Sequence, residues 1–173
     1  MRCTSCQAPL PQGARFCPSC GAARPAHGLL EARKLVTVLF CDVAESTALS
    51  ERLDPEALRG VMLQFFALTR DRVERHGGTV EKFIGDAVMA VFGIPAVSED
   101  DALRAVRAAM DMSGALAELN EHLASRTGVR ITVRTGVNTG EVVTSGGQSG
   151  GQALATGETV NIAARLQQHA RPG

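Results

Sequence analysis

The sequence contains neither tryptophan nor tyrosine, and aromatic residues make up only 3% of it. Proteins that bind single-stranded nucleic acids stack bases on aromatic rings, so this chain is poorly equipped for that role. Positive charge is not in excess either, because 18 Lys and Arg residues balance 18 Asp and Glu residues. A surface that binds a nucleic-acid backbone needs a basic stripe. We therefore expect no nucleic-acid partner.

Long apolar runs are also missing. The longest uncharged apolar stretch, residues 35–41, is far shorter than the roughly 20 residues that cross a bilayer as a helix. The N-terminus, Met1-Arg2-Cys3-Thr4, lacks the apolar core of a signal peptide. We expect a cytoplasmic protein with no membrane partner. Its 173 residues, 45% of them hydrophobic, are enough for one ordinary core and a small appendage.

Four of the five cysteines lie within the first twenty residues as two Cys-x-x-Cys pairs, Cys3 with Cys6 and Cys17 with Cys20. Each pair can turn two thiolates toward one tetrahedral ion, which stabilises a segment too short to have a core. The spacing predicts a zinc-ribbon over residues 1–23 with structural Zn²⁺.

Other interpretations of these cysteines remain. A cytoplasmic setting argues against two disulfides, and the lack of a surrounding βαβ pattern argues against a redox-active pair. Incidental cysteines are a further alternative, and a rubredoxin-like iron site would use similar ligands.

Residues 24–33 mix proline, glycine and charge without a clear period and are expected to form a linker. The main domain is expected over residues 34–173. Its hydrophobic patterns predict strands over 35–41, 79–84, 87–92, 129–137 and 141–144, and helices over 46–53, 54–76, 98–124 and 159–169. The Gly-rich segment 146–151 lacks the Gly-Lys-Ser/Thr ending of a phosphate-binding loop, so we expect a solvated hairpin turn. The order β-α-α-β-β-α-β-β-α indicates an α+β, ferredoxin-like fold with additions.

Two aspartates stand in matching settings. Asp42 follows the apolar run 35–41, and Asp86 lies in the turn between two predicted strands. A carboxylate beside a buried strand is costly to leave unpaired, and two of them repel unless a cation lies between them. We expect both on adjacent strands, where they would bind Mg²⁺ or Mn²⁺ and suit nucleotide phosphates.

Around these aspartates the sequence resembles the class III nucleotidyl cyclases, the adenylyl and guanylyl cyclases. The resemblance rests on four segments in the family's order: residues 36–43, 81–86, 133–142 and 157–166. It implies a ferredoxin-like palm and an activity in which the 3′-hydroxyl of ATP attacks its own α-phosphorus to give 3′,5′-cyclic AMP and pyrophosphate. A Cys-x-x-Cys pair ahead of such a domain is similar to bacterial regulators in which an ATPase module follows the cyclase unit.

The resemblance also implies roles for individual residues. Asp42 and Asp86, with the backbone of Val43, match the ligands of two metal ions. The segment that would donate N–H groups to the β- and γ-phosphates comprises Val43, Ala44, Glu45, Ser46 and Thr47. Asn161 and Arg165 match the pair that positions the ribose and stabilises charge at the α-phosphate. Lys82 matches the adenine-selecting lysine, since a lysine can donate to N1 of adenine whereas N1 of guanine is itself a donor.

In the family these residues do not act within one chain. Asp42 and Asp86 would serve a site that is completed by Lys82, Asn161 and Arg165 of a second copy. The resemblance therefore implies a head-to-tail homodimer with two interfacial sites.

Three features depart from the family pattern. Leu154 replaces the side chain that accepts a hydrogen bond from the adenine amine, and Glu141 replaces a phosphate-binding arginine of some relatives. The chain also ends at Gly173, where family domains continue into further strands, so we expect a C-terminally incomplete domain. These departures favour an alternative, a degenerate cyclase domain that acts as a non-catalytic nucleotide-binding or dimerising regulator. A third hypothesis is a zinc-ribbon interaction protein whose main domain is a scaffold.

Overall fold

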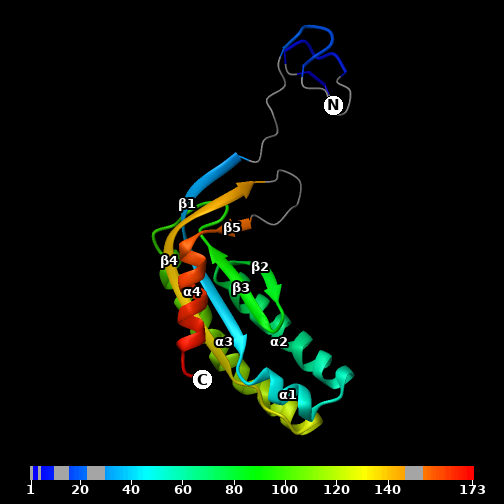
Figure 1. Ribbon diagram of the computed structural model, residues 1–173, viewed down its shortest axis with the longest axis vertical. Coiled ribbons are helices and arrows are strands. Elements are labelled where there is room, and N and C mark those ends of the chain that lie inside the picture. The colour runs from blue at the N-terminus through cyan, green and yellow to red at the C-terminus, as the bar shows by residue number, and fades with distance from the viewer. Residues whose placement is uncertain (1, 4, 10–15, 23–29, 147–153) are drawn as a thin grey trace. The chain divides into compact units, whose positions relative to one another are not determined.

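A computed structural model of the chain describes residues 2–3, 5–9, 16–22, 30–146 and 154–173 (Figure 1). The chain divides into two compact units, Met1–Leu30 and Glu31–Gly173. No helix in the described part of the chain is long and apolar enough to cross a membrane.

The first unit contains two turns of the same design, one at each Cys-x-x-Cys pair. The N–H of Cys3 donates to the carbonyl of Ala8 at 2.8 Å, and the N–H of Cys17 donates to the carbonyl of Ala22 at 2.9 Å. Four residues after each of these cysteines the backbone is left-handed, with φ of 59° at Gln7 and 69° at Gly21. Such turns direct both sulfurs of a pair to the same side.

Among its described residues, the second unit contains one five-stranded sheet and four helices. The strands are β1 (Leu30–Val43), β2 (Thr79–Ile84), β3 (Ala87–Phe92), β4 (Val133–Gly146) and β5 (Leu154–Thr156). The helices are α1 (Ser46–Arg52), α2 (Pro55–Arg75), α3 (Asp101–Thr127) and α4 (Glu158–His169). The strand order is β2-β3-β1-β4-β5, and the pairs β1–β3, β2–β3 and β4–β5 are antiparallel. The prediction of an α+β palm is confirmed.

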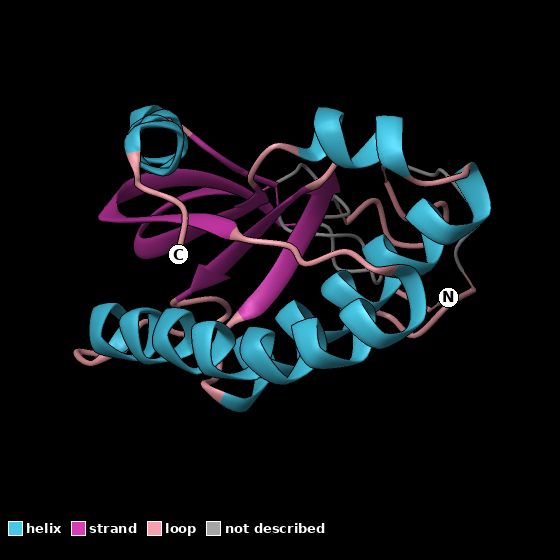
Figure 2. Ribbon diagram, turned by 90° about the horizontal axis from the view of Figure 1, so that it is seen from below, coloured by secondary structure: helices cyan, strands magenta, loops and turns pink. Residues whose placement is uncertain are grey.

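Both faces of the sheet are covered, which explains why β1 is mainly apolar over residues 35–41. Leu39, Cys41 and Val43 point to the face on which α2 and α3 pack, and Val36, Val38 and Phe40 point to the face on which α4 packs. Figure 2 shows α4 on one side of the sheet and the long helices on the other. Because Asp42 follows Phe40 at a spacing of two, it lies on the α4 face.

Helix α4 packs closely on β4 at two glycines. A Cβ at Gly136 would overlap the backbone of α4 at Ala163 and Gln167, and one at Gly140 would lie 2.5 Å from Oγ1 of Thr159. Only glycine permits this approach at either position.

The second half of the sheet differs from the sequence-based prediction. Residues 129–137 and 141–144 were expected as two strands, but β4 runs without a break from Val133 to Gly146, and β5 was not predicted. Asn138-Thr139-Gly140 is typical of a turn, yet Gly140 serves helix packing here. Of the expected Gly-rich turn, residues 147–151 lie outside the described residues.

Candidate active site

The two aspartates meet where β1 and β3 pair. Asp42 of β1 lies opposite Ala87, the first residue of β3. Asp86 immediately precedes Ala87, in the tight turn that Gly85 makes with a φ of 63°. The strand register therefore brings together two carboxylates that are 44 positions apart in the sequence.

The environment of Asp42 disfavours its ionised form. Burial and the nearby charge of Asp86 raise the pKa of Asp42, and they outweigh the opposing effects of Gln167 and Arg134. Nε2 of Gln167 donates a hydrogen bond to Oδ2 of Asp42 at 3.1 Å. Within the described residues, the other oxygen, Oδ1, is buried and has no hydrogen-bond partner.

These observations fit a divalent cation. A buried carboxylate oxygen without a donor, next to a second carboxylate that repels it, gains most from a cation bound by both groups. Oxygen ligands of this kind suit Mg²⁺ and Mn²⁺.

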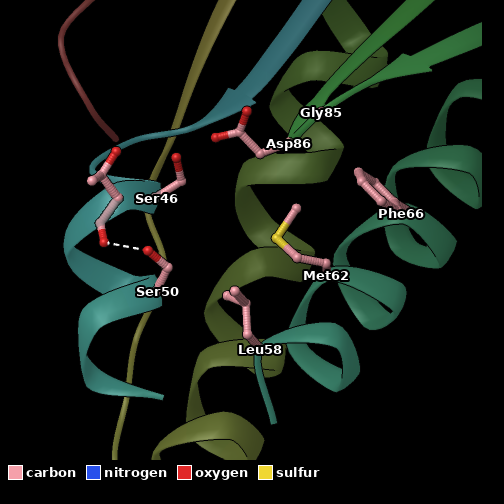
Figure 3. Close-up of a pocket in the computed structure, with 8 residues that line it drawn as sticks. Ser46, Ser50, Leu58, Met62, Phe66, Gly85 and Asp86 are labelled. Carbon is pink, nitrogen blue, oxygen red and sulfur yellow. Dashed lines mark hydrogen bonds between the residues drawn. The ribbon is translucent and has the colours of Figure 1, made fainter. Parts of the chain in front are cut away.

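A pocket of about 320 Å³ opens beside Asp86 (Figure 3). One wall carries hydroxyl groups from α1, and the opposite wall is apolar and comes from α2. The lining residues are Ser46, Thr47, Ser50, Leu58, Met62, Phe66, Gly85 and Asp86. In Figure 3 the carboxylate of Asp86 points to the side of the pocket on which Ser46 lies.

The segment expected to bind phosphates forms the tight connection between β1 and α1. Val43 ends β1 and is buried, and Glu45 is left-handed with a φ of 58°. Ser46 and Thr47 begin α1, so their N–H groups have no acceptor within the helix. The N–H of Ala44, by contrast, already donates to the carbonyl of Thr132 at 2.8 Å. The expectation that Ala44 donates to a phosphate is therefore not supported by this geometry.

The other expected site residues lie elsewhere on the α4 face. Lys82 lies opposite Met89, which belongs to the core under α4. Asn161 and Arg165 are exposed on α4. Among the described residues no hydrogen bond or ion pair joins either of them to Asp42 or Asp86.

The first unit holds a second candidate metal centre. One sulfur from each of Cys3, Cys6, Cys17 and Cys20 lies within 4.8 Å of the other three. Backbone N–H groups of Cys20 and Ser19 lower the pKa of Cys17 to about 6, and those of Cys6 and Ser5 lower that of Cys3. For Cys6 the lowering effect of the Ala8 N–H is outweighed by the Cys20 sulfur and by burial, which raise its pKa to about 12. Four sulfurs this close together can act as the four ligands of one Zn²⁺.

Sequence reasoning missed two residues that act on Asp42. Gln167 lies on the buried stripe of α4 with Thr159 and Ala163, and a long polar side chain at such a spacing is a signal for a buried hydrogen bond. Arg134 of β4 favours ionised Asp42, and its Nε is buried without a hydrogen-bond partner in the described part of the chain. Nothing in its local pattern indicates which group it approaches.

Comparisons with known proteins agree with this geometry. Residues 30–173 match the adenylate and guanylate cyclase catalytic domain, and residues 2–23 match a zinc-ribbon domain. An adenylate cyclase of Anabaena cylindrica is 32% identical over 138 residues, which cover 76% of this chain and 26% of that protein. Adenylate cyclase 1 of Rhizobium meliloti is 31% identical, over 78% of this chain and 21% of that protein. The chain thus spans about a quarter of the length of these curated relatives.

Solved structures give the same result. The guanylyl cyclase Cya2 superimposes with a TM-score of 0.77 at 33% identity, over 82% of this chain and 73% of that one. The adenylyl cyclase CyaB from P. aeruginosa superimposes with a TM-score of 0.76 at 30% identity, over 82% and 75%. Sequence match, fold and the paired aspartates lead to one conclusion: residues 30–173 belong to the class III adenylate and guanylate cyclase family.

Proposed function

We propose that this chain is an adenylate cyclase that converts ATP to 3′,5′-cyclic AMP and pyrophosphate at the interface of a head-to-tail homodimer, in cytoplasmic signalling. Asp42 and Asp86 of one copy would bind two Mg²⁺ or Mn²⁺ ions with the backbone of Val43. Lys82, Asn161 and Arg165 of the other copy would complete the site.

One observation carries the dimeric site. Asp42 and Asp86 lie together, whereas Asn161 and Arg165 are exposed on α4 and form no hydrogen bond or ion pair with them among the described residues. A site that needs all four side chains is therefore open within one chain, and a second copy would close it.

Exposed apolar residues near these groups support the same arrangement. Ile162 and Leu166, beside Asn161 and Arg165 on α4, are 37% and 48% exposed. Ile84, two residues after Lys82 on β2 and so on the same face of the strand, is 47% exposed. Apolar side chains that accompany functional residues on a surface are typical of an interface.

The chain's residues would contribute to the reaction by positioning and charge. Lys82 would hold the adenine, Asn161 would orient the ribose so that its 3′-oxygen faces the α-phosphorus, and Arg165 would stabilise charge as the pyrophosphate leaves. N–H groups of Glu45, Ser46 and Thr47 would hold the β- and γ-phosphates. Cations on Asp42 and Asp86 would supply charge neutralisation and a lower pKa for the 3′-hydroxyl.

The choice of ATP rests on Lys82, whose ammonium is a donor suited to N1 of adenine. The two curated relatives described above are adenylate cyclases, while the similar structures include a guanylyl cyclase. Leu154 offers no acceptor to the adenine amine, so the lysine would provide most of the discrimination.

An assay of the purified chain tests the proposal. The chain is incubated with Mn²⁺ and either ATP or GTP, and the cyclic product is measured, with Asp42→Ala as the inactive control. We expect cyclic AMP from the wild-type chain, and more of it than cyclic GMP. A preference for GTP would contradict the role of Lys82.

A non-catalytic regulator is the second candidate. Glu141 favours it, because an exposed carboxylate would repel a polyphosphate, although Arg33, 3.9 Å away, offsets part of its charge. Nucleotide binding without any cyclic product in the same assay would support this alternative.

A further inference from the structure

Glu81, on the edge strand β2, is buried: only 5% of its surface is exposed. Its carboxylate accepts a hydrogen bond from the backbone N–H of Ala155, which lies 3.2 Å from Oε1 and 3.3 Å from Oε2. Ala155 is in β5, at the other edge of the sheet. The curled sheet thus brings its two edges together at this side chain. A buried carboxylate is costly, so its placement calls for an explanation.

An irregularity in β2 places this carboxylate. Val80 pairs with Ala90 and Lys82 pairs with Met89, so Glu81 is an extra residue, a β-bulge. In a regular strand Glu81 and Lys82 would point to opposite faces. With the bulge, both side chains reach the α4 face. Lys82 lies opposite Met89, and Glu81 accepts from Ala155. Met89 and Ala155 belong to the core under α4. Bulges commonly redirect a side chain beside a functional site.

The same carboxylate also pairs with its neighbour. Nζ of Lys82 lies 3.8 Å from Oε1 of Glu81, and the lysine side chain is 36% exposed while that of the glutamate is 5% exposed. The ammonium therefore has a fixed anionic partner beneath it and an open side above. A flexible lysine is restrained in this way without its outer donors being used.

We propose that Glu81 is a positioning residue for base selection: its carboxylate holds the Lys82 ammonium on one side and the backbone of β5 on the other. The inference rests on the proposed function, in which Lys82 contacts the base. Glu81 itself does not touch the nucleotide. It would fix the direction of the lysine donor and the position of β5, the strand that Leu154 begins.

The test compares Glu81→Gln with Glu118→Gln, which removes one negative charge from an exposed position on α3. Gln keeps an oxygen that can accept from Ala155 but has no charge with which to form an ion pair with the ammonium. For each protein we would measure thermal unfolding, kcat and KM for ATP and GTP with Mn²⁺, and equilibrium binding of fluorescent ATP and GTP analogues. We expect Glu81→Gln to lower the ATP-over-GTP ratio of kcat/KM about fivefold, mainly through KM for ATP. Glu118→Gln should leave the ratio unchanged.

A second comparison asks whether Glu81 acts through the lysine. In a Lys82→Gln background, Glu81→Gln should change the ratio no further, since the partner that it orients is absent. Equal effects of Glu81→Gln in both backgrounds, or an unchanged ratio in a Glu81→Gln protein that unfolds like wild type, would overturn the proposal.

A variant with a shorter acidic side chain, Glu81→Asp, covers the case in which Glu81→Gln does not fold. Should Glu81→Gln not fold, Glu81→Asp keeps the charge but cannot reach both partners, and it should lower the ratio as well. If neither variant folds, Glu81 serves only to close the sheet and the proposal is wrong. A wild-type chain that neither binds nor cyclises either nucleotide would instead contradict the proposed function, which is a distinct result.

Discussion

Gln167, near the end of α4, donates its amide hydrogen to Asp42, 125 positions earlier in the chain, with 3.1 Å between Nε2 and Oδ2. The amide is buried, since Gln167 is only 5% exposed. It engages one carboxylate oxygen and leaves the other, Oδ1, without a hydrogen-bond partner in the described part of the chain. In the proposed site this arrangement would orient Asp42 so that one oxygen is offered to a cation. Outer partners of this kind tune metal affinity.

Replacement of Gln167 by Ala should therefore weaken metal binding. We expect about a tenfold loss of Mn²⁺ affinity, the lower end of the range for such outer partners, because Asp42 loses its orientation. The affinity can be measured by calorimetric titration of Mn²⁺. Gln168→Ala, at the exposed neighbouring position, is the matched control. Equal Mn²⁺ affinities for the two variants would contradict the role assigned to Gln167.

Mixing two inactive variants tests whether sites are shared. Asp42→Ala spoils one half of a site and Asn161→Ala spoils the other, so a mixed dimer keeps one intact site. Random pairing at equal amounts should restore about a quarter of wild-type cyclase activity, since half of the dimers are mixed and each has one working site.

The control for this mixture is Asp42→Ala with Asp86→Ala. Both changes lie in the same half of the site, so no pairing of these chains yields an intact one. Activity in that control, or none at any ratio of the first pair, would contradict the dimeric site.

Asp42→Asn should stabilise the metal-free protein at neutral pH. The pKa of Asp42 is raised above its ordinary 3.8, so the folded chain binds protons more readily than the unfolded chain. Folding stability must then fall as the pH rises from 3.8 to the raised pKa, and the penalty persists above it. Removal of the charge removes this penalty, and Tm should rise by a few degrees.

Unfolding curves in EDTA across this pH range measure the effect. The advantage of Asp42→Asn over wild type should shrink as the pH approaches 3.8, while Mn²⁺ should stabilise the wild type more than the variant. A variant that is less stable than wild type in EDTA at pH 7 would refute this explanation.

Cys17→Ser should remove zinc from the first unit without unfolding the second. The four sulfurs lie within 4.8 Å of one another, so the loss of one leaves an incomplete tetrahedron. The second unit has its own core, and its unfolding transition should be unchanged. Mass spectrometry measures the zinc content, and calorimetry measures the unfolding transition. Ser19→Ala is the control and should keep one zinc per chain. Zinc retained by Cys17→Ser would count against the four-cysteine site.

Local patterns in the sequence were sufficient to predict that Asp42 and Asp86 lie close together. The apolar run before Asp42 predicts a central strand, and the two short strands around Asp86 predict a hairpin, so both carboxylates could be placed at adjacent strand ends. The same holds for the helices, whose apolar spacing and terminal residues are encoded locally. Asp54, for example, accepts from the N–H of Ala57 at 2.8 Å and begins α2 as a cap.

Features that depend on distant contacts were not predictable. The segment Asn138-Thr139-Gly140 has the residue types of a turn. Only the packing of Thr159 against Gly140 explains why β4 is unbroken there. The bulge at Glu81 reverses the side-chain direction that strand alternation predicts. The buried position of Gln167 could be predicted from the apolar spacing of α4. Its contact with Asp42 could not, because the two residues are far apart in the sequence. In each case tertiary structure overrides a local preference.

The placement of α4 has a consequence for a dimer. One face of this helix holds Asp42, the proposed metal ligand of its own chain, through Gln167. Its exposed side carries Asn161 and Arg165, which we propose act in the site of the other chain. Gly136 of β4 lets the backbone of α4 pack directly against that strand. A shift of the helix would therefore be transmitted to the sheet. A nucleotide that draws in α4 from the opposite copy would thereby disturb that copy's own aspartate. The two sites of such a dimer would communicate, and turnover would depend cooperatively on how many of them are filled.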